Sequence, residues 1–372
     1  MTTQQIETTP RAKPNAFLLN SKVVMIPYII AITIAELVTT YSNPNVGIAF
    51  HAIIAVILLL HWSYASQYGN FDILIALLSA PMIRLLSLAL PLFMIPIKYW
   101  YLAVSIPLYI AAFIIMRTLG YSFKSLLGKR KDLFFHLGIG STGLIFGVVE
   151  YSILHTTPII DSPTLPNLVV GAFVMTVGTG IMEELVFRGI LQKAAEKSLG
   201  KLGGLLFAAI IFTMMHIGWQ SLIDLFFVFT VGSFWGYIFQ KRSSILGTSI
   251  SHSLTNILLF LILPFIFPAA PTLPHLLPVV APTPAPIVQQ APEVLSTSVP
   301  ENASLPQDNL LARPTDLQAF VQTPPDSSSQ NKNMEQYVEY AEIAVASQIY
   351  LLLIWVSLMR VPILKKLRRI KG

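Results

Sequence analysis

The sequence predicts an all-α protein, a polytopic bundle of about ten membrane-spanning helices with a disordered, Pro-rich extracytoplasmic loop. Of the 372 residues, 54% are hydrophobic and only 11% are charged, whereas a soluble domain carries roughly 25% charged residues. The apolar residues form runs that are mostly long enough to cross a bilayer, which takes about 20 residues. Lys and Arg gather in the short polar segments between these runs, as expected for membrane orientation.

Ten apolar runs are expected to span the membrane. Nine follow one another closely, and a long polar segment separates them from the tenth. The expected spans are residues 23–41, 45–65, 72–95, 99–116, 133–155, 168–187, 204–217, 222–240, 244–264 and 343–360. The seventh run is short, so its placement depends on the helices that pack against it.

Composition divides the chain into five parts. Residues 1–22 are polar and lack the apolar core of a cleavable signal peptide, so they are expected in the cytoplasm. Accessory helices are expected over residues 23–132, and a membrane core that contains the polar clusters considered below is expected over residues 133–265. Residues 266–342 are rich in Pro, Ser, Thr, Ala and Gln, a composition that cannot bury a core and predicts disorder. Residues 343–372 are expected to form a final helix and a basic cytoplasmic tail.

The distribution of positive charge predicts how the chain is oriented. Placing both termini in the cytoplasm puts most Lys and Arg of the short loops on that side. We therefore expect a multi-pass protein of a bacterial plasma membrane, with the lipid bilayer as a partner and without nucleic acid. The chain has no Cys, which excludes disulfides, thiolate metal ligands and a Cys nucleophile.

Three acidic or basic residues lie within the apolar runs of the first half. Glu36 and Arg84 are expected at similar depth, because each lies about 12–14 residues from the cytoplasmic end of its span. An intramembrane ion pair between them is favoured, and a proton or ion path is the alternative. Glu150 lies near the outer end of its span without an obvious partner, and we interpret it as interfacial.

Three polar clusters within apolar helices are the most informative feature of the chain. Ionisable groups are costly in hydrocarbon, so they usually face the bundle interior and mark a functional site. Two Glu, two His and an Asn are also side chains that activate water and hold an oxyanion. The clusters are Glu183, Glu184 and Arg188; Phe212 and His216; and His252 and Asn256.

The spacing of the clusters predicts which side chains meet. Gly200, in a Gly-rich connection, is 17 residues after Glu183 and 16 residues before His216. If the flanking helices are antiparallel, Glu183 and His216 lie at the same depth, as a water-activating pair requires. His252 and Asn256 are four positions apart, so they share one face of a helix.

Each of these residues also has a structural interpretation. Glu184 and Arg188 have the spacing of a helical ion pair, and Arg188 alone could mark the inner membrane interface. A single intramembrane His, or Asn256, is more often a hydrogen-bonding residue between helices than a catalyst. Because the three clusters occur together, a catalytic role is favoured over a structural one, and the clusters predict a hydrolase that works inside a membrane.

At these residues the chain resembles the CPBP family (CaaX proteases and bacteriocin-processing enzymes), also called the type 2 CaaX prenyl protease or Abi family. The family signature is Glu-Glu-x-x-x-Arg, then Phe-x-x-x-His, then His-x-x-x-Asn or Asp. Here the three motifs begin at Glu183, Phe212 and His252, in that order. The resemblance covers roughly residues 135–265.

The resemblance implies an intramembrane endopeptidase that cleaves a membrane-associated or lipidated protein or peptide, as in the maturation of CaaX-box proteins. By analogy with the family, Glu183 is the general base and His216 helps to orient the attacking water. His252 and Asn256 would stabilise the tetrahedral oxyanion. Glu184 and Arg188 would support them.

The involvement of a metal and of catalysis itself stays open at this level. Glu, His and His could ligate zinc with an open fourth position, but the sequence lacks His-Glu-x-x-His. The family is described both as metalloproteases and as a metal-independent glutamate type, and we slightly favour no permanent metal. A non-catalytic membrane scaffold or bacteriocin-immunity-type protein is the main alternative. A transporter is a weaker one, because we find no internal repeat of the clusters.

Overall fold

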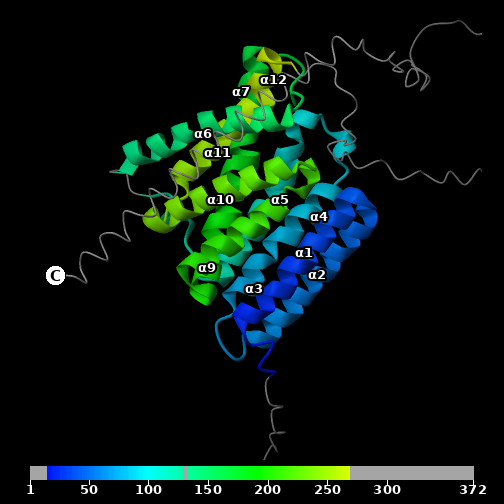
Figure 1. Ribbon diagram of the computed structural model, residues 1–372, viewed down its shortest axis with the longest axis vertical. Helices are drawn as coiled ribbons and strands as arrows, with labels where there is room; N and C mark the ends of the chain where they lie inside the picture. Colours follow the sequence, from blue (N-terminus) through cyan, green and yellow to red (C-terminus); the bar gives the residue numbers. More distant parts are fainter. Residues whose placement is uncertain (1–14, 129–131, 269–372) are drawn as a thin grey trace, which may run out of the picture. The chain divides into compact units, whose positions relative to one another are not determined.

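The computed structural model describes residues 15–128 and 132–268, and every regular element in these ranges is a helix. The expected all-α class is therefore confirmed for the described part of the chain, which Figure 1 shows as a bundle of helices. The expected Pro-rich loop, tenth span and basic tail lie outside the described residues.

The first half of the described chain contains five α-helices. Asn20 and Asn43 cap the first two, because each side chain accepts hydrogen bonds from backbone amides of the first helical turn. The fourth helix ends at Ala89 rather than near residue 95 as expected, because Leu90 is extended and a Pro follows it. The helices are α1 (Ser21–Tyr41), α2 (Pro44–Ala65), α3 (Asp72–Leu77), α4 (Ser79–Ala89) and α5 (Trp100–Thr118), with 3₁₀ turns η1 (Leu92–Met94), η2 (Ile97–Tyr99) and η3 (Phe123–Leu126).

The second half contains the remaining helices, which include three π-helical segments. Such segments are rare and often mark functional sites. The elements are α6 (Leu133–Leu154), α7 (Leu165–Val174), π-helix η5 (Met175–Ile181), α8 (Met182–Glu184), π-helix η6 (Leu185–Gln192), α9 (Lys193–Met214), 3₁₀ turn η7 (Ile217–Trp219), α10 (Leu222–Arg242), α11 (Leu246–Ile257), π-helix η8 (Leu258–Ile262) and α12 (Leu263–Ile266).

Eight helices in the described residues are long and apolar enough to cross a membrane. This indicates a multi-pass integral membrane protein. The tenth expected span, 343–360, lies outside the described residues. Two of the other expected spans, 168–187 and 204–217, fall within one helical run of 55 residues, Leu165–Trp219. At 1.5 Å per residue that run would measure about 80 Å, far more than a hydrocarbon core of about 30 Å. Gly200 breaks it, with φ 80° and ψ 170°.

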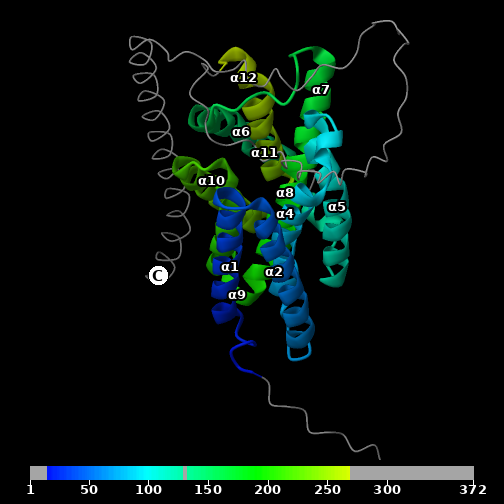
Figure 2. The ribbon, with the colours of Figure 1, turned by 90° about the vertical axis from the view of Figure 1, so that its right-hand side faces the viewer.

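Glycines allow the closest helix contact near the site. A Cβ at Gly143 of α6 would lie 2.0 Å from the Ser251 carbonyl oxygen of α11, and one at Gly147 would lie 2.9 Å from the Thr255 oxygen. Small residues bring helix backbones together in this way inside membranes. α11 also packs on η5, while α1 packs on α2 and α9, an arrangement visible in the perpendicular views of Figures 1 and 2.

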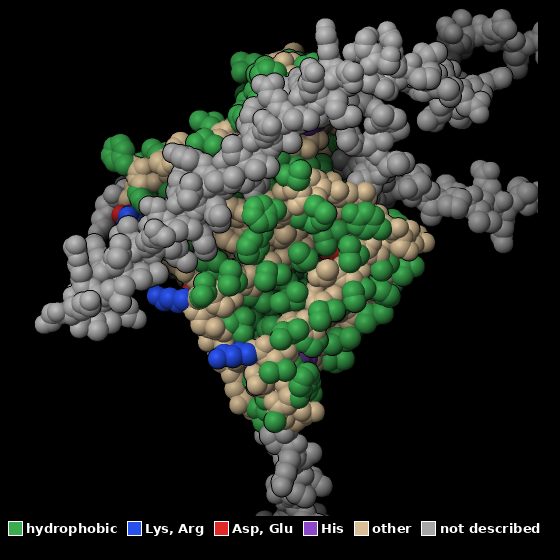
Figure 3. Space-filling view, viewed as in Figure 1, with side chains coloured by type: hydrophobic (Ala, Val, Ile, Leu, Met, Phe, Trp, Pro, Cys, Tyr) green, Lys and Arg blue, Asp and Glu red, His purple; other side chains and the backbone are tan. Residues whose placement is uncertain are grey.

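The outer surface of the helices is largely apolar. Hydrophobic side chains dominate the described face in Figure 3. A patch of this extent would be unfavourable in water and is suited to lipid. Exposed apolar side chains recur on one face of several helices, as in Ile26, Ile30 and Ile34 of α1, Ile53, Ile57 and Leu60 of α2, and Ile106, Ile110 and Phe113 of α5.

The expected ion pair of the first half is present. Arg84 of α4 donates from Nε to Glu36 Oε1 at 2.9 Å and from Nη2 to Glu36 Oε2 at 2.7 Å. Glu36 of α1 is fully buried, and His51 Nε2 of α2 lies 3.3 Å from its Oε1. The pair therefore ties α1, α2 and α4 together within the bundle.

Candidate active site

The four side chains predicted to be catalytic line one cavity. Glu183 reaches it from α8, His216 from the end of α9, and His252 and Asn256 from α11. The cavity has a volume of about 80 Å³, enough for several water molecules at roughly 10–15 Å³ each on this measure. Three segments that are far apart in sequence thus enclose a space suited to hydrolysis.

The turn at Gly200 brings the first two motifs together. Its positive φ is a conformation that glycine adopts at little cost. The chain then turns back so tightly that a Cβ at Gly204 would lie 2.4 Å from the backbone nitrogen of Glu196. α9 packs on η6, with Phe212 against Phe187, and Glu183 and His216 line the same cavity.

The two adjacent glutamates face different surroundings. Glu183 is partly open, with 27% of its side chain exposed, and it lines the cavity. Glu184 is fully buried and its Oε1 lies 2.9 Å from Arg188 Nη1, which confirms the predicted helical ion pair. Arg188 also donates to the Gly232 carbonyl at 3.2 Å and lies over the Phe212 ring at 4.5 Å. Arg188 is therefore committed to Glu184 and to packing, and Glu183 is left free of it.

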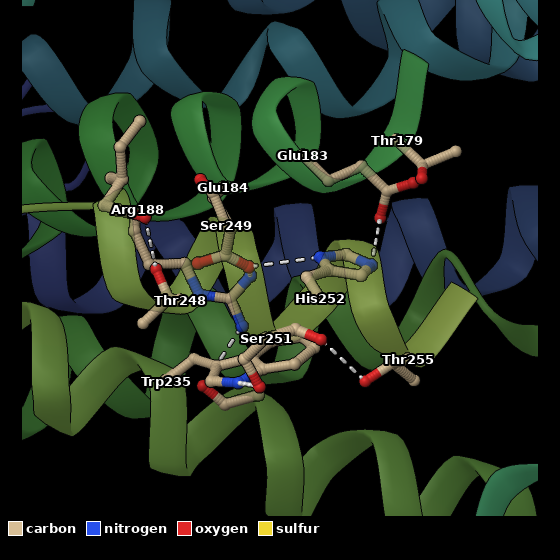
Figure 4. A network of polar contacts seen from close by, with 12 residues as sticks. Thr179, Glu183, Glu184, Arg188, Trp235, Thr248, Ser249, Ser251, His252 and Thr255 are labelled. Carbon is tan, nitrogen blue, oxygen red and sulfur yellow. Dashed lines mark hydrogen bonds and ion pairs between the residues drawn. The ribbon is translucent and has the colours of Figure 1, made fainter. Parts of the chain in front are cut away.

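His252 lies between the two glutamates, as Figure 4 shows. Its Nδ1 is 3.3 Å from Glu184 Oε1, and its Nε2 is 3.8 Å from Glu183 Oε2. The ring stacks on Trp235, with centroids 4.6 Å apart and an interplanar angle of 24°. Because a carboxylate only accepts hydrogen bonds, the proton on Nδ1 points to Glu184, and Nε2 faces Glu183. Glu184 thus orients His252 as well as pairing with Arg188.

His216 is held by its own helix. Its Nδ1 lies 2.8 Å from the Phe212 carbonyl oxygen, and its ring packs against Phe212 with centroids 4.6 Å apart. A carbonyl oxygen can only accept, so Nδ1 carries the proton and Nε2 is left as an acceptor in the neutral ring. The Phe of the second motif therefore sets both the position and the tautomer of His216.

Asn256 has a partner that the sequence reasoning did not identify. Its Nδ2 donates to Thr179 Oγ1 at 2.9 Å, and Thr179 in turn donates to the Met175 carbonyl at 2.5 Å. Thr179 also lines the cavity. Thr179 stands four residues before Glu183, so on a helix the two side chains share a face. This spacing is the signal in the sequence that could have identified Thr179.

Glu150 differs from its expected interfacial position. It is 8% exposed and lines the cavity, because the glycines of α6 draw this helix against α11. Fully buried Asp224 of α10 lies close enough to interact with it electrostatically, and so does Glu183. Hydropathy alone gave no sign of this, since a residue near a span end faces outward or inward depending on helix rotation.

Arg84 connects the first four helices to the site. Besides binding Glu36, its Nη2 donates to the Met215 carbonyl at 2.9 Å. Met215 precedes His216 at the C-terminal end of α9, where unpaired carbonyls favour a cation. The Arg84–Glu36 ion pair therefore helps to hold in place the backbone that precedes His216.

The cavity carries nitrogen and oxygen atoms of the kinds that bind zinc. Across residues 15–128 and 132–268, no group of three or more His, Cys, Asp or Glu side chains is arranged to hold a metal ion. The Nδ1 atoms of His216 and His252 are engaged by a carbonyl and by Glu184, which leaves Nε2 of each ring as the available nitrogen.

A family comparison matches the region that builds most of this cavity. The description "Type II CAAX prenyl endopeptidase Rce1-like" matches residues 165–258, from the start of α7 to the start of η8. No match to the chain was found among curated proteins or among solved structures. The matched range includes all six predicted site residues and lies inside the expected core, while α6 and the first four spans fall outside it. Residues 165–258 are thus an Rce1-like type II CAAX prenyl endopeptidase (CPBP/Abi) family domain, and this membership suggests intramembrane protease activity.

Proposed function

We propose that the protein is an intramembrane endopeptidase that cleaves a membrane-associated or lipidated protein or peptide with water activated by Glu183. One observation carries the proposal: Glu183, His216, His252 and Asn256 line one cavity within an apolar bundle. A scaffold or immunity protein would have no need to keep a partly open carboxylate beside two histidines in a space large enough for water.

In the proposed first step, water lies between Glu183 and the Nε2 acceptor of His216. Glu183 takes one proton from the water, and the water oxygen adds to the peptide carbonyl carbon. The carbonyl double bond opens and its electron pair becomes the oxyanion. His216 orients the water through a hydrogen bond, because its Nδ1 proton is engaged by Phe212.

In the proposed second step, the oxyanion is held by His252 and Asn256. In its protonated form His252 donates from Nδ1 to Glu184 and keeps Nε2 as a donor toward the cavity. Asn256 uses one amide hydrogen on Thr179 and has the other for the oxyanion. Protonated Glu183 then gives its proton to the leaving nitrogen as the C–N bond breaks.

Glu184 and Arg188 are supporting residues in this scheme. The ion pair neutralises the buried charge of Glu184. Glu184 Oε1 also orients the His252 ring, whose Nδ1 lies 3.3 Å away. The cytoplasmic location of both termini stays a prediction from the distribution of Lys and Arg.

The test is cleavage by the purified full-length chain in lipid nanodiscs, with a library of lipid-anchored peptides and with or without a chelator. We expect Glu183→Gln to lower turnover by about 10²–10⁴-fold, because an amide cannot accept the proton. Glu196→Gln is the matched control. Glu196 lies in the turn region, bonds to Gln192 and does not line the cavity.

The two variants separate the possible outcomes. Full peptidase activity of Glu183→Gln, with both proteins folded, would remove Glu183 as the base. Absence of cleavage by the wild-type chain in every peptide and lipid tested would favour the scaffold alternative. Loss of activity with a chelator would show that a metal ion takes part.

A further inference from the structure

The cavity has a second acidic region that the proposed mechanism does not use. Glu150 of α6 lines it, and more than nine-tenths of this residue is buried. Asp224, in the first turn of α10, is 0% exposed, and neither of its carboxylate oxygens has a hydrogen-bond partner. No hydrogen bond to the Glu150 carboxylate is found among the described residues either. Glu150 lines the cavity, and Asp224 is a second buried acid within electrostatic range of it. Both lack the hydrogen-bond partners that buried polar groups normally have.

The acids near Glu150 have no basic side chain beside them at the cavity. Glu150 lies close enough to Asp224 and to Glu183 to interact with each electrostatically. Among the described residues that line the cavity there is no Lys or Arg. The two nearby guanidinium groups, Arg84 and Arg188, are each bound to another glutamate. A buried carboxyl group without a partner favours its neutral form, because the isolated charge is costly there, and a cation brought by a ligand would stabilise the ionised form.

Aromatic rings form part of the wall of the same cavity, and we call this part the aromatic wall. Tyr101, Trp219 and Phe260 line the same cavity. The Trp219 and Phe260 ring centroids are 5.8 Å apart, and those of Tyr101 and Phe260 are 6.2 Å apart. Ring faces attract ammonium and guanidinium groups, most strongly where water is excluded. A carboxylate in a cavity with an aromatic wall suits an organic cation.

We infer that Glu150, supported by Asp224 and the aromatic wall, binds the cationic side chain of a Lys or Arg residue close to the scissile bond of the substrate. The inference rests on the proposed function and narrows its substrate class to peptides with a basic residue near the cleaved bond. The catalytic and cation-binding carboxylates then have separate tasks in one cavity. Glu183 acts on water, and Glu150 selects the peptide.

The test uses N-acetylated peptides that differ at one position only, with Lys, Arg or the neutral isostere norleucine scanned on both sides of the scissile bond. At one position we expect the wild-type chain to cleave the basic peptide with a kcat/KM at least about tenfold above that of the norleucine peptide. In Glu150→Gln we expect that ratio of kcat/KM values to fall close to one, because kcat/KM falls for the basic peptides. Glu150→Asp keeps a carboxylate and should retain part of the preference.

Further variants and peptides make the result decisive. Asp224→Asn should lower the ratio less than Glu150→Gln does, and the control Glu196→Gln should leave it unchanged. Cleavage that depends on Glu183 but is equal for Lys and norleucine at every position would overturn the inference and leave the proposed function standing. A basic preference that survives in folded Glu150→Gln would overturn it too. A gain confined to peptides with a free N-terminus would assign the cation to the terminal amine and refute the side-chain assignment.

If Glu150→Gln does not fold, the wild-type chain still decides the question through inhibition by short acetylated peptide amides. Amides with Lys or Arg should compete with the substrate at concentrations at least about tenfold below those of the norleucine amide. Equal competition would refute the inference.

Discussion

The same arrangement of Glu, Arg and His occurs twice in this molecule, with different surroundings. In the first triad, Glu36 binds Arg84 and lies 3.3 Å from His51. In the second triad, Glu184 binds Arg188 and lies 3.3 Å from His252. Each glutamate is fully buried, and each arginine donates to a main-chain carbonyl as well, that of Met215 or Gly232.

The difference between the triads lies in what their histidines face. His51 is 0% exposed and does not line the cavity, whereas His252 lines it and has Glu183 on its other side. A buried triad is therefore a way to hold charge within an apolar bundle and is not by itself a catalytic device. Chemistry requires the adjacent cavity and an acid that no arginine neutralises.

Replacing the two histidines tests this comparison most directly. We expect His252→Ala to lower kcat by about 10²–10³-fold, since it removes an oxyanion donor. His51→Ala should leave kcat within a factor of about three and instead lower stability by about 1–3 kcal/mol, through a cavity beside Glu36. Turnover and thermal inactivation midpoints of both variants check this. A similar loss of kcat in His51→Ala would place the first triad in the chemistry.

Asn256 and Thr179 sharpen the comparison at the oxyanion. Asn256→Ala should cost about 10²–10³-fold in kcat, with a much smaller change in KM because the charge develops only in the transition state. Thr179→Val keeps the shape and removes the hydroxyl that holds the amide, so we expect a smaller loss, about tenfold. A large rise in KM at unchanged kcat in Asn256→Ala would instead assign this residue to ground-state binding.

Arg84 tests whether the first triad also acts on the site from a distance. Arg84→Met alone would leave Glu36 buried and unpaired, which typically costs about 3–5 kcal/mol. The double variant Glu36→Gln with Arg84→Met removes both charges together. If Arg84 positions His216 through Met215, the folded double variant should lose about tenfold in kcat with KM little changed.

A conservative variant serves as the control for Arg84. Arg84→Lys keeps the positive charge and can donate to either Glu36 or Met215, but it lacks the bidentate geometry. It should recover part of the kcat lost in the double variant. Wild-type kcat in the folded double variant would limit the first triad to a structural role.

Several site contacts follow from local spacing, and these could be predicted. Glu184 and Arg188 pair because positions four apart on a helix are neighbours. His252 and Asn256 line one cavity for the same reason. Glu183 and His216 line one cavity because a glycine with positive φ separates the two helical segments that carry them. Glu36 and Arg84 were predicted from depth alone, since a charge in hydrocarbon needs a partner at its own level.

Other contacts required the packed structure. His252 lies 68 residues from Glu184, and Arg84 lies 131 residues from Met215. Depth along the membrane normal does not give the rotation of each helix, which decides the side chains it presents to its neighbours. The position of Glu150 was wrong for this reason, because the glycine face of α6 turns that acid toward α10 and the cavity.

The sequence by itself determined the helical class, the membrane environment and the six candidate site residues. Hydrophobic runs, helical spacing and the energetic cost of charge in hydrocarbon are local properties that a sequence carries directly. Only the tertiary structure decided which histidine faces the cavity, which carbonyl Arg84 supports and which acids lack a partner. These depend on helix rotation and close packing, and those follow from the shapes of all neighbouring side chains at once.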